Sequence, residues 1–555
     1  MAISRTKACC GVFLTLLFVT VIVALIATLV VKSRRSPEGW GCFRHAAVAA
    51  DSELCSEIGS DMLYIGGSAV DGAIAALLCT SLMNPQSMGI GGGVIFTVYN
   101  ADGTVKIINA RETVPRNVKP DLLVECPETF QLMPGSQWMG VPGEIRGYAE
   151  AHRLYGKLPW RILFQPAIRL ARQGFPIPIP LGLFLKHLSS SIANSSLCAV
   201  FCDHKGEVLK AGQMVRYPKL ADTLELIAEQ GPDAFYKGSL VEAMVQDTKS
   251  QGGILTPEDF ENFKAKIQDP LQVEMGGYLM YVPPLPAGGA VLSFILKVME
   301  GFGLTPNSLK GENRTLTYHR IIEALKFGNG QKRKTNWSAK EVHNLVSEGF
   351  ANNVRKLIDD HRTHPLQYYT LFPGRDSVGT THVSVLAEDG SAVSVTSTIN
   401  QIFGSMVYSP KTGVIFNNEL ADFCGKNISI LPGEQPPSSV APLVFVNKSR
   451  NSMLVIGGSG GSMITSSIAQ VIMNYLWLGY DLKDAVAAPV LHVTSSNEVQ
   501  FERSFNTSVK EELRAMGHMV TESAHFFNVV NAVSKQGGCI AAVSDARKMG
   551  VAAGY

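Results

Sequence analysis

The sequence lacks several features that mark common functional classes. Its formal net charge is only +2 over 555 residues, so no large excess of positive charge is present to attract nucleic acid. Glycine and proline number 52 and 28, close to average usage, which argues against a low-complexity or fibrous chain. No internal repeat is visible. A chain of this length exceeds one ordinary core and predicts one large or two intertwined domains.

Long apolar runs are also scarce, and the only one that could cross a membrane is at residues 8–31. As a helix it would span the hydrocarbon core of about 30 Å. No small-residue cleavage site is evident, so we expect an uncleaved anchor rather than a signal peptide. This predicts a cytoplasmic tail at 1–7, the anchor at 8–31 and a stalk at 32–43. A single span argues against a transporter.

Glycosylation signals follow the anchor. Six Asn-X-Ser/Thr sequons are spread over the remaining chain and predict a luminal or extracellular body. They begin at Asn194, Asn313, Asn336, Asn427, Asn447 and Asn506.

Ten cysteines are present, eight of them beyond the anchor. Cys55 and Cys79 lie on two neighbouring segments of helical character, and Cys198 and Cys202 are four residues apart. Disulfides would fit an oxidising compartment. A metal site of Cys198, Cys202 and His204 is the alternative, but it lacks a fourth ligand and a second pair.

Two helices and a glycine-rich loop are expected near the start of the body. Residues 44–65 read as one helix, and Ser68 as the N-cap of a second helix that continues through Met83. The loop 84–93 follows, and a strand-like run at 94–99 comes next. Phosphate-binding loops run from a strand into a helix and carry a trailing Lys-Ser/Thr, so we expect these glycines to permit close backbone packing or unusual dihedrals instead.

Two further positions have both a structural and a functional interpretation. Arg111 closes the strand-like run 105–109; local sequence favours a surface charge, although arginine also suits carboxylate recognition. Residues 455–461, Val-Ile-Gly-Gly-Ser-Gly-Gly, stand between a strand and a helix-like segment. Their amides could bind an oxyanion, or the glycines could form a tight packing turn.

Residues 380–398 predict a β-hairpin. Two runs that alternate polar and apolar residues flank Glu388-Asp389-Gly390. A three-residue loop with a left-handed Gly390 pairs polar with polar residues, whereas a two-residue loop would mismatch the faces. The favoured register puts Thr380 opposite Thr398. A threonine freed at its own amino group by cleavage after Gly379 would carry nucleophile and base in one residue; alternatively, these threonines only serve the strand.

Long motifs resemble the gamma-glutamyltransferases (glutathione hydrolases) over nearly the whole chain after the anchor. The resemblance is carried by residues 84–93, 108–112, 141–148, 379–382, 396–400, 416–419, 437–439 and 544–555. The stretch 286–296 looks closest to the gamma-glutamyl leukotrienase branch, the glutathione hydrolase 5 type. The resemblance implies an α+β fold, the N-terminal nucleophile hydrolase αββα sandwich. It also implies a precursor that cuts itself into a large subunit, 44–379, and a small catalytic subunit, 380–555, which remain together as a heterodimer.

The resemblance also implies roles for individual residues. Thr380 would be the nucleophile, Thr398 its hydrogen-bond partner, and Gly460 and Gly461 the oxyanion hole. The remaining positions would hold the substrate: its α-carboxylate by Arg111, Ser438 and Ser439, and its α-ammonium by Asn400, Glu419 and Asp422. Disulfides are implied for Cys55–Cys79 and Cys198–Cys202.

The implied activity is cleavage of the γ-glutamyl bond of glutathione and its S-conjugates, including leukotriene C4, through an acyl-enzyme. Water, amino acids or dipeptides would accept the γ-glutamyl group, and neither a metal nor another cofactor is required. The expected location is the plasma membrane, as a single-pass type II protein with an extracellular catalytic domain. A related amidase with another acyl donor, and an uncleaved, inactive membrane glycoprotein of the same fold, are the alternatives.

One segment departs from the family pattern. Relatives carry a Leu-Gly-Asp-Pro turn after an aromatic helix, whereas residues 327–338 of this chain read Phe-Gly-Asn-Gly-Gln-Lys-Arg-Lys-Thr-Asn-Trp-Ser. The segment precedes the expected cleavage point, and it is the sole support for the uncleaved alternative.

Overall fold

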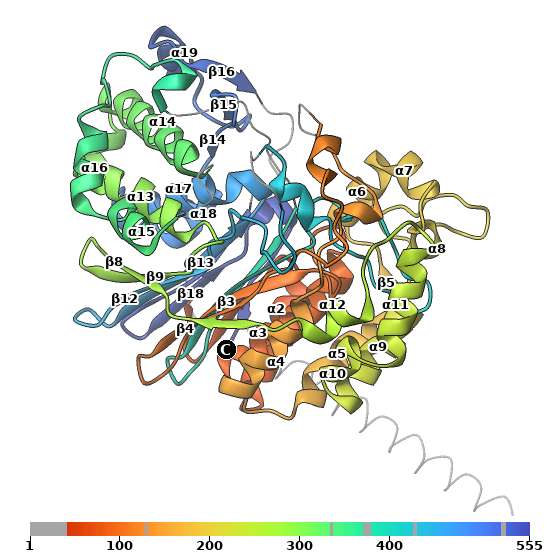
Figure 1. The fold of residues 1–555 in the computed structure, drawn as a ribbon. Helices are drawn as coiled ribbons and strands as arrows, with labels where there is room; N and C mark the ends of the chain where they lie inside the picture. The colour runs from red at the N-terminus through yellow and green to blue at the C-terminus, as the bar shows by residue number, and fades with distance from the viewer. Residues whose placement is uncertain (1–41, 128–130, 333–336, 370–378, 426–429, 523–528) are drawn as a thin grey trace, which may run out of the picture.

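Two stacked β-sheets form the centre of the molecule (Figure 1). The computed structural model describes residues 42–127, 131–332, 337–369, 379–425, 430–522 and 529–555. Sheet I has the strand order β19-β2-β10-β11-β3-β4-β7, and sheet II the order β1-β18-β17-β13-β12-β9-β8. Neighbouring strands in both sheets are antiparallel.

The strands of sheet I are β2 (Ala47–Ala49), β3 (Gly93–Tyr99), β4 (Val105–Ala110), β7 (Lys266–Gln268), β10 (Thr381–Leu386), β11 (Ala392–Thr398) and β19 (Ala553–Gly554). Those of sheet II are β1 (Cys42–Phe43), β8 (Leu271–Met275), β9 (Tyr278–Val282), β12 (Leu443–Asn447), β13 (Ser452–Ser459), β17 (Val529–Gln536) and β18 (Cys539–Val543). Two small sheets lie outside, formed by β5 (Phe175–Pro176), β6 (Met214–Val215), β14 (Leu491–Val493), β15 (Glu498–Phe501) and β16 (Met519–Glu522).

Helices cover the outer face of each sheet (Figure 1). Sheet I is covered by α2 (Glu53–Tyr64), α3 (Ala69–Met83) and α4 (Glu144–Tyr155). Sheet II is covered by α13 (Gly289–Glu300), α17 (Ile464–Leu476) and α18 (Leu482–Ala487). The expected αββα sandwich is therefore confirmed.

More peripheral helices surround these layers. On the side of sheet I they are α5 (Trp160–Gln173), α6 (Ile179–His187), α7 (Ser189–Ala193), α8 (Cys198–Phe201), α9 (Pro218–Gln230), α10 (Asp233–Tyr236), α11 (Ser239–Lys249) and α12 (Pro257–Asn262). On the side of sheet II they are α14 (Asn313–Lys332), α15 (Ala339–Leu345), α16 (Glu348–Arg355) and α19 (Thr507–Ala515). Single 3-10 turns are η1 (Leu122–Glu125), η2 (Ser136–Trp138), η3 (Pro306–Leu309), η4 (Leu366–Tyr369), η5 (Glu419–Phe423), η6 (Gly461–Met463) and η7 (Ala546–Lys548).

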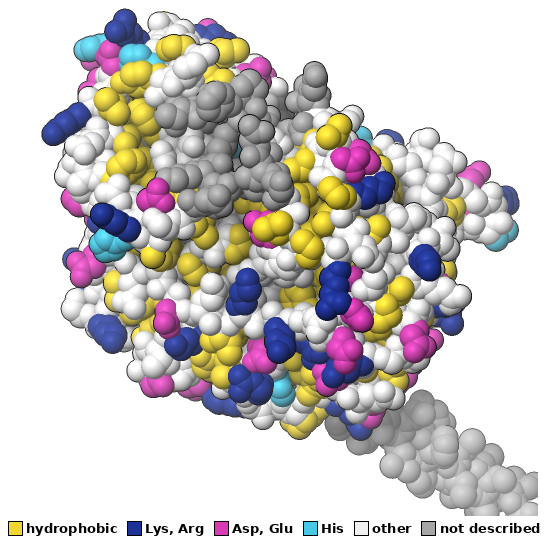
Figure 2. Space-filling view, in the orientation of Figure 1, with side chains coloured by type: hydrophobic (Ala, Val, Ile, Leu, Met, Phe, Trp, Pro, Cys, Tyr) yellow, Lys and Arg dark blue, Asp and Glu magenta, His cyan; other side chains and the backbone are white. Residues whose placement is uncertain are grey.

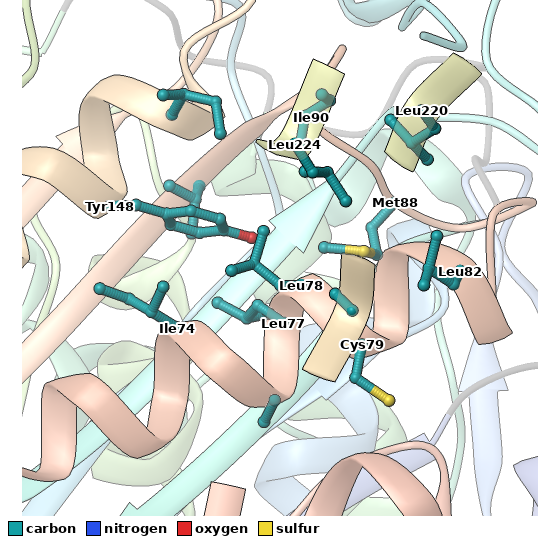
Figure 3. Close-up of a cluster of buried hydrophobic side chains, with 14 of the residues drawn as sticks. Ile74, Leu77, Leu78, Cys79, Leu82, Met88, Ile90, Tyr148, Leu220 and Leu224 are labelled. Carbon is teal, nitrogen blue, oxygen red and sulfur yellow. The ribbon is translucent and has the colours of Figure 1, made fainter. Parts of the chain in front are cut away.

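Helix α3 lies at the centre of the core beneath sheet I. It begins as expected at Ser68, whose side chain accepts from the amide of Asp71 while the Asp71 carboxylate accepts from the Ser68 amide, a capping box. The helix is buried on every side because it lies between sheet I and α5. Figure 3 shows its leucines beside Tyr148 of α4 and beside Met88 of the glycine-rich loop. The core therefore fixes the loop that leads into β3.

The hairpin β10–β11 has the register that the sequence favoured. Thr381 pairs with Ser397 and Leu386 with Ala392, and Gly390 has a left-handed φ of +84°. Extending the pairing by one residue places Thr380 opposite Thr398. His382, Ser384 and Ser394 of the hairpin face the second sheet rather than solvent.

Hydroxyl groups link the two sheets through their shared interior. Three side chains of sheet I donate to backbone carbonyls of, or next to, sheet II at 2.7–3.1 Å: Thr97 to Pro442, Ser384 to Asn531, and Ser394 to Ile456. Buried hydroxyls need such partners. The interface between the sheets is therefore held by specific polar contacts as well as by apolar packing.

The expected helix over 44–65 is only partly correct. Helix α2 begins at Glu53, whereas residues 47–49 form β2, which pairs with β10. The run Ala46–Ala50 is apolar but does not show helical periodicity. Its backbone N–H and C=O groups instead find hydrogen-bond partners on the edge of β10. Tertiary pairing thus overrides local propensity here.

The chain segments before and after residue 379 share both sheets. In sheet I, β10, β11 and β19 come from the later segment and the other strands from the earlier one. Sheet II mixes β1, β8 and β9 with four strands of the later segment. The two segments are therefore intertwined rather than separate domains. On the face drawn in Figure 2, both signs of charge are interspersed.

Of the helices in the described part of the chain, none is both apolar enough and long enough for a membrane span. The expected tail and anchor, and all but the last two residues of the stalk, lie outside the described residues.

Candidate active site

Thr380 stands immediately before β10, in a backbone conformation that β-branched residues rarely adopt. Its φ is +82°, in the left-handed region. Its hydroxyl donates to Thr398 Oγ1 at 3.1 Å, and Thr398 Oγ1 also accepts from the amide of Asn400 at 2.8 Å. The side chain is 4 % exposed. The Thr380 hydroxyl is therefore oriented toward Thr398, at a residue whose backbone is strained.

Gly379 has no room for a side chain. Its φ is +142°, and a Cβ built on it would lie 1.9 Å from the carbonyl oxygen of Asn400. Its own carbonyl oxygen accepts from the amide of Gly460 at 2.9 Å. Strained residues of this kind each cost on the order of 1–3 kcal/mol and gather at functional sites. The Gly379–Thr380 peptide is thus strained on the threonine side, and its carbonyl is polarised.

The glycine-rich loop 84–93 supports the β10–β11 hairpin at Thr380. The carbonyl of Ser87 accepts from the amides of Thr380 and Ile399, at 3.3 and 3.2 Å. A Cβ at Gly91 or Gly92 would lie 2.0–2.1 Å from a backbone carbonyl oxygen. Close backbone packing, one of the two roles that the sequence allowed, is therefore the role of these two glycines.

Arg111, at the end of β4, is buried rather than exposed, so the preference of the local sequence for a surface charge was wrong. Its Nη2 donates to Glu419 Oε2 at 3.0 Å and to Asp422 Oδ2 at 2.7 Å, and its Nε donates to the carbonyl of Pro436 at 2.7 Å. It is 2 % exposed. Burial of this charge is tolerated because the guanidinium donates both to carboxylates and to a backbone carbonyl.

The carboxyl groups around Arg111 outnumber its single positive charge. Burial raises the pKa of Glu419 well above its usual value, against the opposing effect of Arg111. Burial likewise raises the pKa of Glu112 to about 8. One oxygen of Glu419, Oε1, is buried without a hydrogen-bond partner. The group is thus short of cationic partners, and a bound ammonium would supply one.

The other predicted binding residues adjoin this group. Pro437, whose carbonyl accepts from Arg111 Nη2 at 3.1 Å, directly precedes Ser438 and Ser439. The Ser438 hydroxyl accepts from the amide of Val440 at 3.2 Å. Asn400 donates through Nδ2 to the carbonyl of Asn418, next to Glu419, at 3.0 Å. The residues predicted to bind the two charged groups of the donor thus lie close to one another along these segments.

Gly460 follows β13, and Gly461 begins η6, which leads into helix α17. Both have positive φ, +119° and +60°. This turn sends the amide of Gly460 toward Gly379. The strand–turn–helix order agrees with the sequence expectation.

Lys548 is a residue that the sequence analysis missed. Its ammonium donates to the carbonyl of Thr380 at 2.8 Å, to Asp51 Oδ2 at 2.8 Å and to Ser459 Oγ at 2.9 Å. Asp51 also accepts from the hydroxyl of Thr381 at 2.5 Å. The only available signal was the position of Lys548 inside the 544–555 motif. This network fixes the backbone on the other side of Thr380.

Comparisons with known proteins agree with this geometry. The family model described as Gamma-glutamyltranspeptidase matches residues 55–555. The chain belongs to this family. It is 46% identical to the glutathione hydrolase 5 proenzyme of Mus musculus over 579 residues, with 100% of both chains covered. It is also 46% identical to that of Homo sapiens over 565 residues, with 96% of each covered.

A solved structure supports the fold. The crystal structure of cephalosporin acylase from Bacillus halodurans superimposes with a TM-score of 0.84 at 25% identity, covering 94% of this chain and 97% of that one. The protein is therefore an enzyme of the gamma-glutamyltranspeptidase family with an N-terminal nucleophile hydrolase fold.

His382, within the family motif, is structural. Burial lowers its pKa to about 3, with a smaller effect of Lys548. Its ring nitrogens contact the hydroxyls of Thr396 at 2.8 Å and Ser384 at 2.9 Å. A side chain at Gly457 would collide with the ring. His382 is thus a neutral, satisfied group between the sheets.

Four disulfides lie within the described residues. Cys55–Cys79 and Cys198–Cys202 confirm the expected pairs, and the second excludes the metal alternative with His204. Cys42–Cys539 and Cys126–Cys424 were not foreseen. Their sequence separations, 497 and 298 residues, leave no local signal.

The sequons differ in accessibility. Asn194, Asn313 and Asn506 are exposed, whereas Asn447, the last residue of β12, is 5 % exposed. Asn336 and Asn427 lie outside the described residues. Glycosylation stays a prediction, and it is geometrically least plausible at Asn447.

One group of side chains in the described ranges has metal-like spacing. Ligand atoms of His319, Glu323 and His518 lie within 4.8 Å of one another. However, His319 Nδ1 contacts His518 Nε2 at 2.8 Å, and the ammonium of Lys326 lies 3.1 Å from His518 Nδ1 and 3.5 Å from Glu323. The ammonium of Lys326 therefore already lies where a metal ion would have to bind. We interpret the group as a buried polar network.

The segment that departs from the family pattern continues helix α14 to Lys332. The side chain of Asn329 donates to the carbonyl of Val493 at 2.8 Å, and Lys332 donates to the carbonyl of Ser462, within η6, at 3.2 Å. Residues 333–336 lie outside the described part. The altered segment therefore packs against the turn that carries Gly460 and Gly461.

Proposed function

We propose that the protein cuts itself between Gly379 and Thr380, and that Thr380 then cleaves γ-glutamyl bonds of glutathione and its S-conjugates, leukotriene C4 among them. The observation that most directly supports this proposal is the geometry of the Gly379–Thr380 peptide. Its carbonyl accepts from Gly460, and the hydroxyl of the strained Thr380 is held by Thr398.

Self-cleavage requires an attack by a neighbouring hydroxyl. Thr380 Oγ1 adds to the carbonyl carbon of Gly379, the C–N bond breaks, and the proton of the hydroxyl passes to the nitrogen. Water then hydrolyses the resulting ester. The products are a carboxylate on Gly379 and a free amine on Thr380, which can serve as base in later turnovers.

Donor binding follows from the charges of the site. A γ-glutamyl donor presents a free amino-acid head group, so its α-carboxylate would contact Arg111, Ser438 and Ser439. Its α-ammonium would approach Asp422 and the unpartnered Oε1 of Glu419. Asn400, beside them, would accept from the same ammonium.

Turnover reuses the groups that serve self-cleavage. Once Gly379 has left, the amide of Gly460, together with that of Gly461, would stabilise the oxyanion formed from the γ-carbonyl. Thr380 forms an ester with the γ-glutamyl group, and the leaving amine takes a proton. Water, or the amine of an amino acid or dipeptide, releases the product.

Support for processing comes from the relatives, whose names describe proenzymes. The proposed location is the plasma membrane, with the body outside the cell. The apolar run 8–31, the sequons and the four disulfides support it.

The deciding experiment is a reducing, denaturing gel of the purified, deglycosylated chain, with N-terminal sequencing of the smaller fragment. We expect a fragment that begins at Thr380, and hydrolysis of glutathione and leukotriene C4 by the cut protein. Thr380→Ala should be uncut and inactive, whereas Thr380→Ser keeps a hydroxyl and should be cut.

An uncut wild-type chain would favour the inactive-glycoprotein alternative. A cut chain that does not hydrolyse γ-glutamyl donors would favour an amidase with another acyl donor. The structural similarity to cephalosporin acylase is the observation that supports this alternative. The acidic group around Arg111 argues against the latter, because it suits an amino-acid head group.

A further inference from the structure

Two of the four disulfides found in the described part of the chain cross the proposed cleavage point. Cys42–Cys539 and Cys126–Cys424 each join a residue before Gly379 to one after it, with Cα–Cα distances of 5.4 and 5.7 Å. These distances are typical of disulfides. The other two, Cys55–Cys79 and Cys198–Cys202, lie wholly in the earlier segment.

Cys126–Cys424 closes a small apolar cluster of its own. Cys126 directly follows η1 and Cys424 directly follows η5. Leu122 of η1 packs with Leu420 and Phe423 of η5 in a cluster distinct from the main cores. A cluster of this size buries little apolar surface. We therefore expect the disulfide to contribute much of what holds η1 and η5 together.

The turn η5 carries two residues of the proposed donor site. Glu419 begins it and Asp422 lies two residues before Cys424. Both contact Nη2 of Arg111, which belongs to the other side of the cleavage point. Anything that lets η5 shift would therefore separate these carboxylates from the guanidinium.

Cys42–Cys539 lies in a different setting. Strand β1 is the edge strand of sheet II, where Cys42 pairs with Ala541 of β18. The disulfide thus fastens an edge strand of the earlier segment to a strand of the later one.

We propose that these two disulfides keep the large and small fragments covalently joined after cleavage, and that Cys126–Cys424 also holds η5 in position against Arg111. The inference rests on the proposed function for the cleavage and for the donor site. Reduction of each bond consumes two electrons: one dithiol reductant becomes a cyclic disulfide, and the two cysteines become thiols.

The tether is tested on denaturing gels of the full chain made in an oxidising secretory host and alkylated before denaturation. Without reductant we expect one band near the full-chain mass of 59.9 kDa after deglycosylation, and with reductant two bands. Cys42→Ser/Cys539→Ser and Cys126→Ser/Cys424→Ser should each still give one band without reductant. The variant lacking all four cysteines should give two. Two bands from the unreduced wild type would overturn the tether.

The same gel separates this inference from the proposed function. One band in both lanes would mean that cleavage has failed, and the proposed function with it. In that case a non-reduced peptide map decides the pairing. Cross-linked peptides containing Cys126 with Cys424, and Cys42 with Cys539, are expected, whereas alkylated free thiols would overturn it.

The positioning role is tested by kinetics. Cys126→Ser/Cys424→Ser should raise KM for a γ-glutamyl donor on the order of tenfold, equivalent to about 1.4 kcal/mol, with kcat nearly unchanged. Cys42→Ser/Cys539→Ser removes one tether as well and is the matched control; its KM should stay at the wild-type value. Equal KM values in both variants would refute the positioning role, as would a loss confined to kcat.

Discussion

The amide of Gly460 donates to the carbonyl oxygen of Gly379 over 2.9 Å. Gly379 leads into β10 of sheet I, and Gly460 follows β13 of sheet II. The peptide that we expect to break is thus held between the two sheets. Its geometry depends on how the sheets pack on each other.

Gly379→Ala should block cleavage, whereas Gly390→Ala should not. Both glycines have positive φ, but only at position 379 would a Cβ collide with a backbone oxygen, at 1.9 Å. At Gly390 there is open space, so the cost is the dihedral strain of roughly 1 kcal/mol. The fraction of cut chain on a reducing gel measures the difference. Equal cutting in both variants would contradict the steric argument.

Arg111→Lys should raise KM for a γ-glutamyl donor by about tenfold or more, since a hydrogen bond to a charged group contributes about 1.5–3 kcal/mol. Lysine lacks the planar fork that now reaches Glu419, Asp422 and two carbonyls. Arg116→Lys is the control, because Arg116 pairs with Glu258 at the surface. Steady-state kinetics would exclude Arg111 from the site if both variants matched wild type.

Lys548→Met should slow self-cleavage by at least about tenfold, because the buried Asp51 carboxylate would lose its cationic partner, which costs several kcal/mol. The ammonium now bonds to the Thr380 carbonyl, Asp51 and Ser459. A time course of cutting after synthesis is the measurement. The exposed Lys483→Met serves as control. If the Lys548 variant is cut at the wild-type rate, its contact with Thr380 has no part in maturation.

Glu144 should make the protein less stable as the pH rises from about 4.5 to about 8. Burial raises its pKa to about 8 in the folded protein, against 4.5 for an ordinary glutamate. Its contribution to stability is therefore fully present below about pH 4.5 and is lost as the pH rises through 8, by roughly 1.4 kcal/mol per pH unit at most.

Glu144→Gln keeps an acceptor for the Tyr148 hydroxyl, which donates to Oε1 at 2.6 Å. Between pH 6.5 and 8.5, its Tm should fall less steeply than that of the wild type. Glu150→Gln, on the solvent-facing side of the same helix, should follow the wild-type slope. Parallel slopes for all three proteins would argue against a buried, protonated Glu144.

The sequence predicted best where its signals are local. The hairpin register followed from alternation and from Gly390, and the start of α3 followed from Ser68. The proposed nucleophile and its partner thus became neighbours by pattern alone, before any family resemblance was used.

What it missed depends on contacts distant in sequence. Strand β2 exists because β10 has a free edge, and Arg111 is buried because η5, some 300 residues later, brings two carboxylates. The contact of Lys548 with Thr380 and the disulfides Cys42–Cys539 and Cys126–Cys424 likewise join residues too far apart for any short sequence segment to predict. Only the assembled sheets reveal them.

The hydroxyl contacts of Thr97, Ser384 and Ser394 with carbonyls of the opposite layer have a consequence beyond stability. An entirely apolar interface would allow the two sheets to slide slightly past each other, because apolar contacts are not directional. Directional bonds resist such shear. Catalytic alignment in this protein would then be set deep in the interior, so conservative interior changes such as Thr97→Val would misalign Gly460 and Thr380 without touching either.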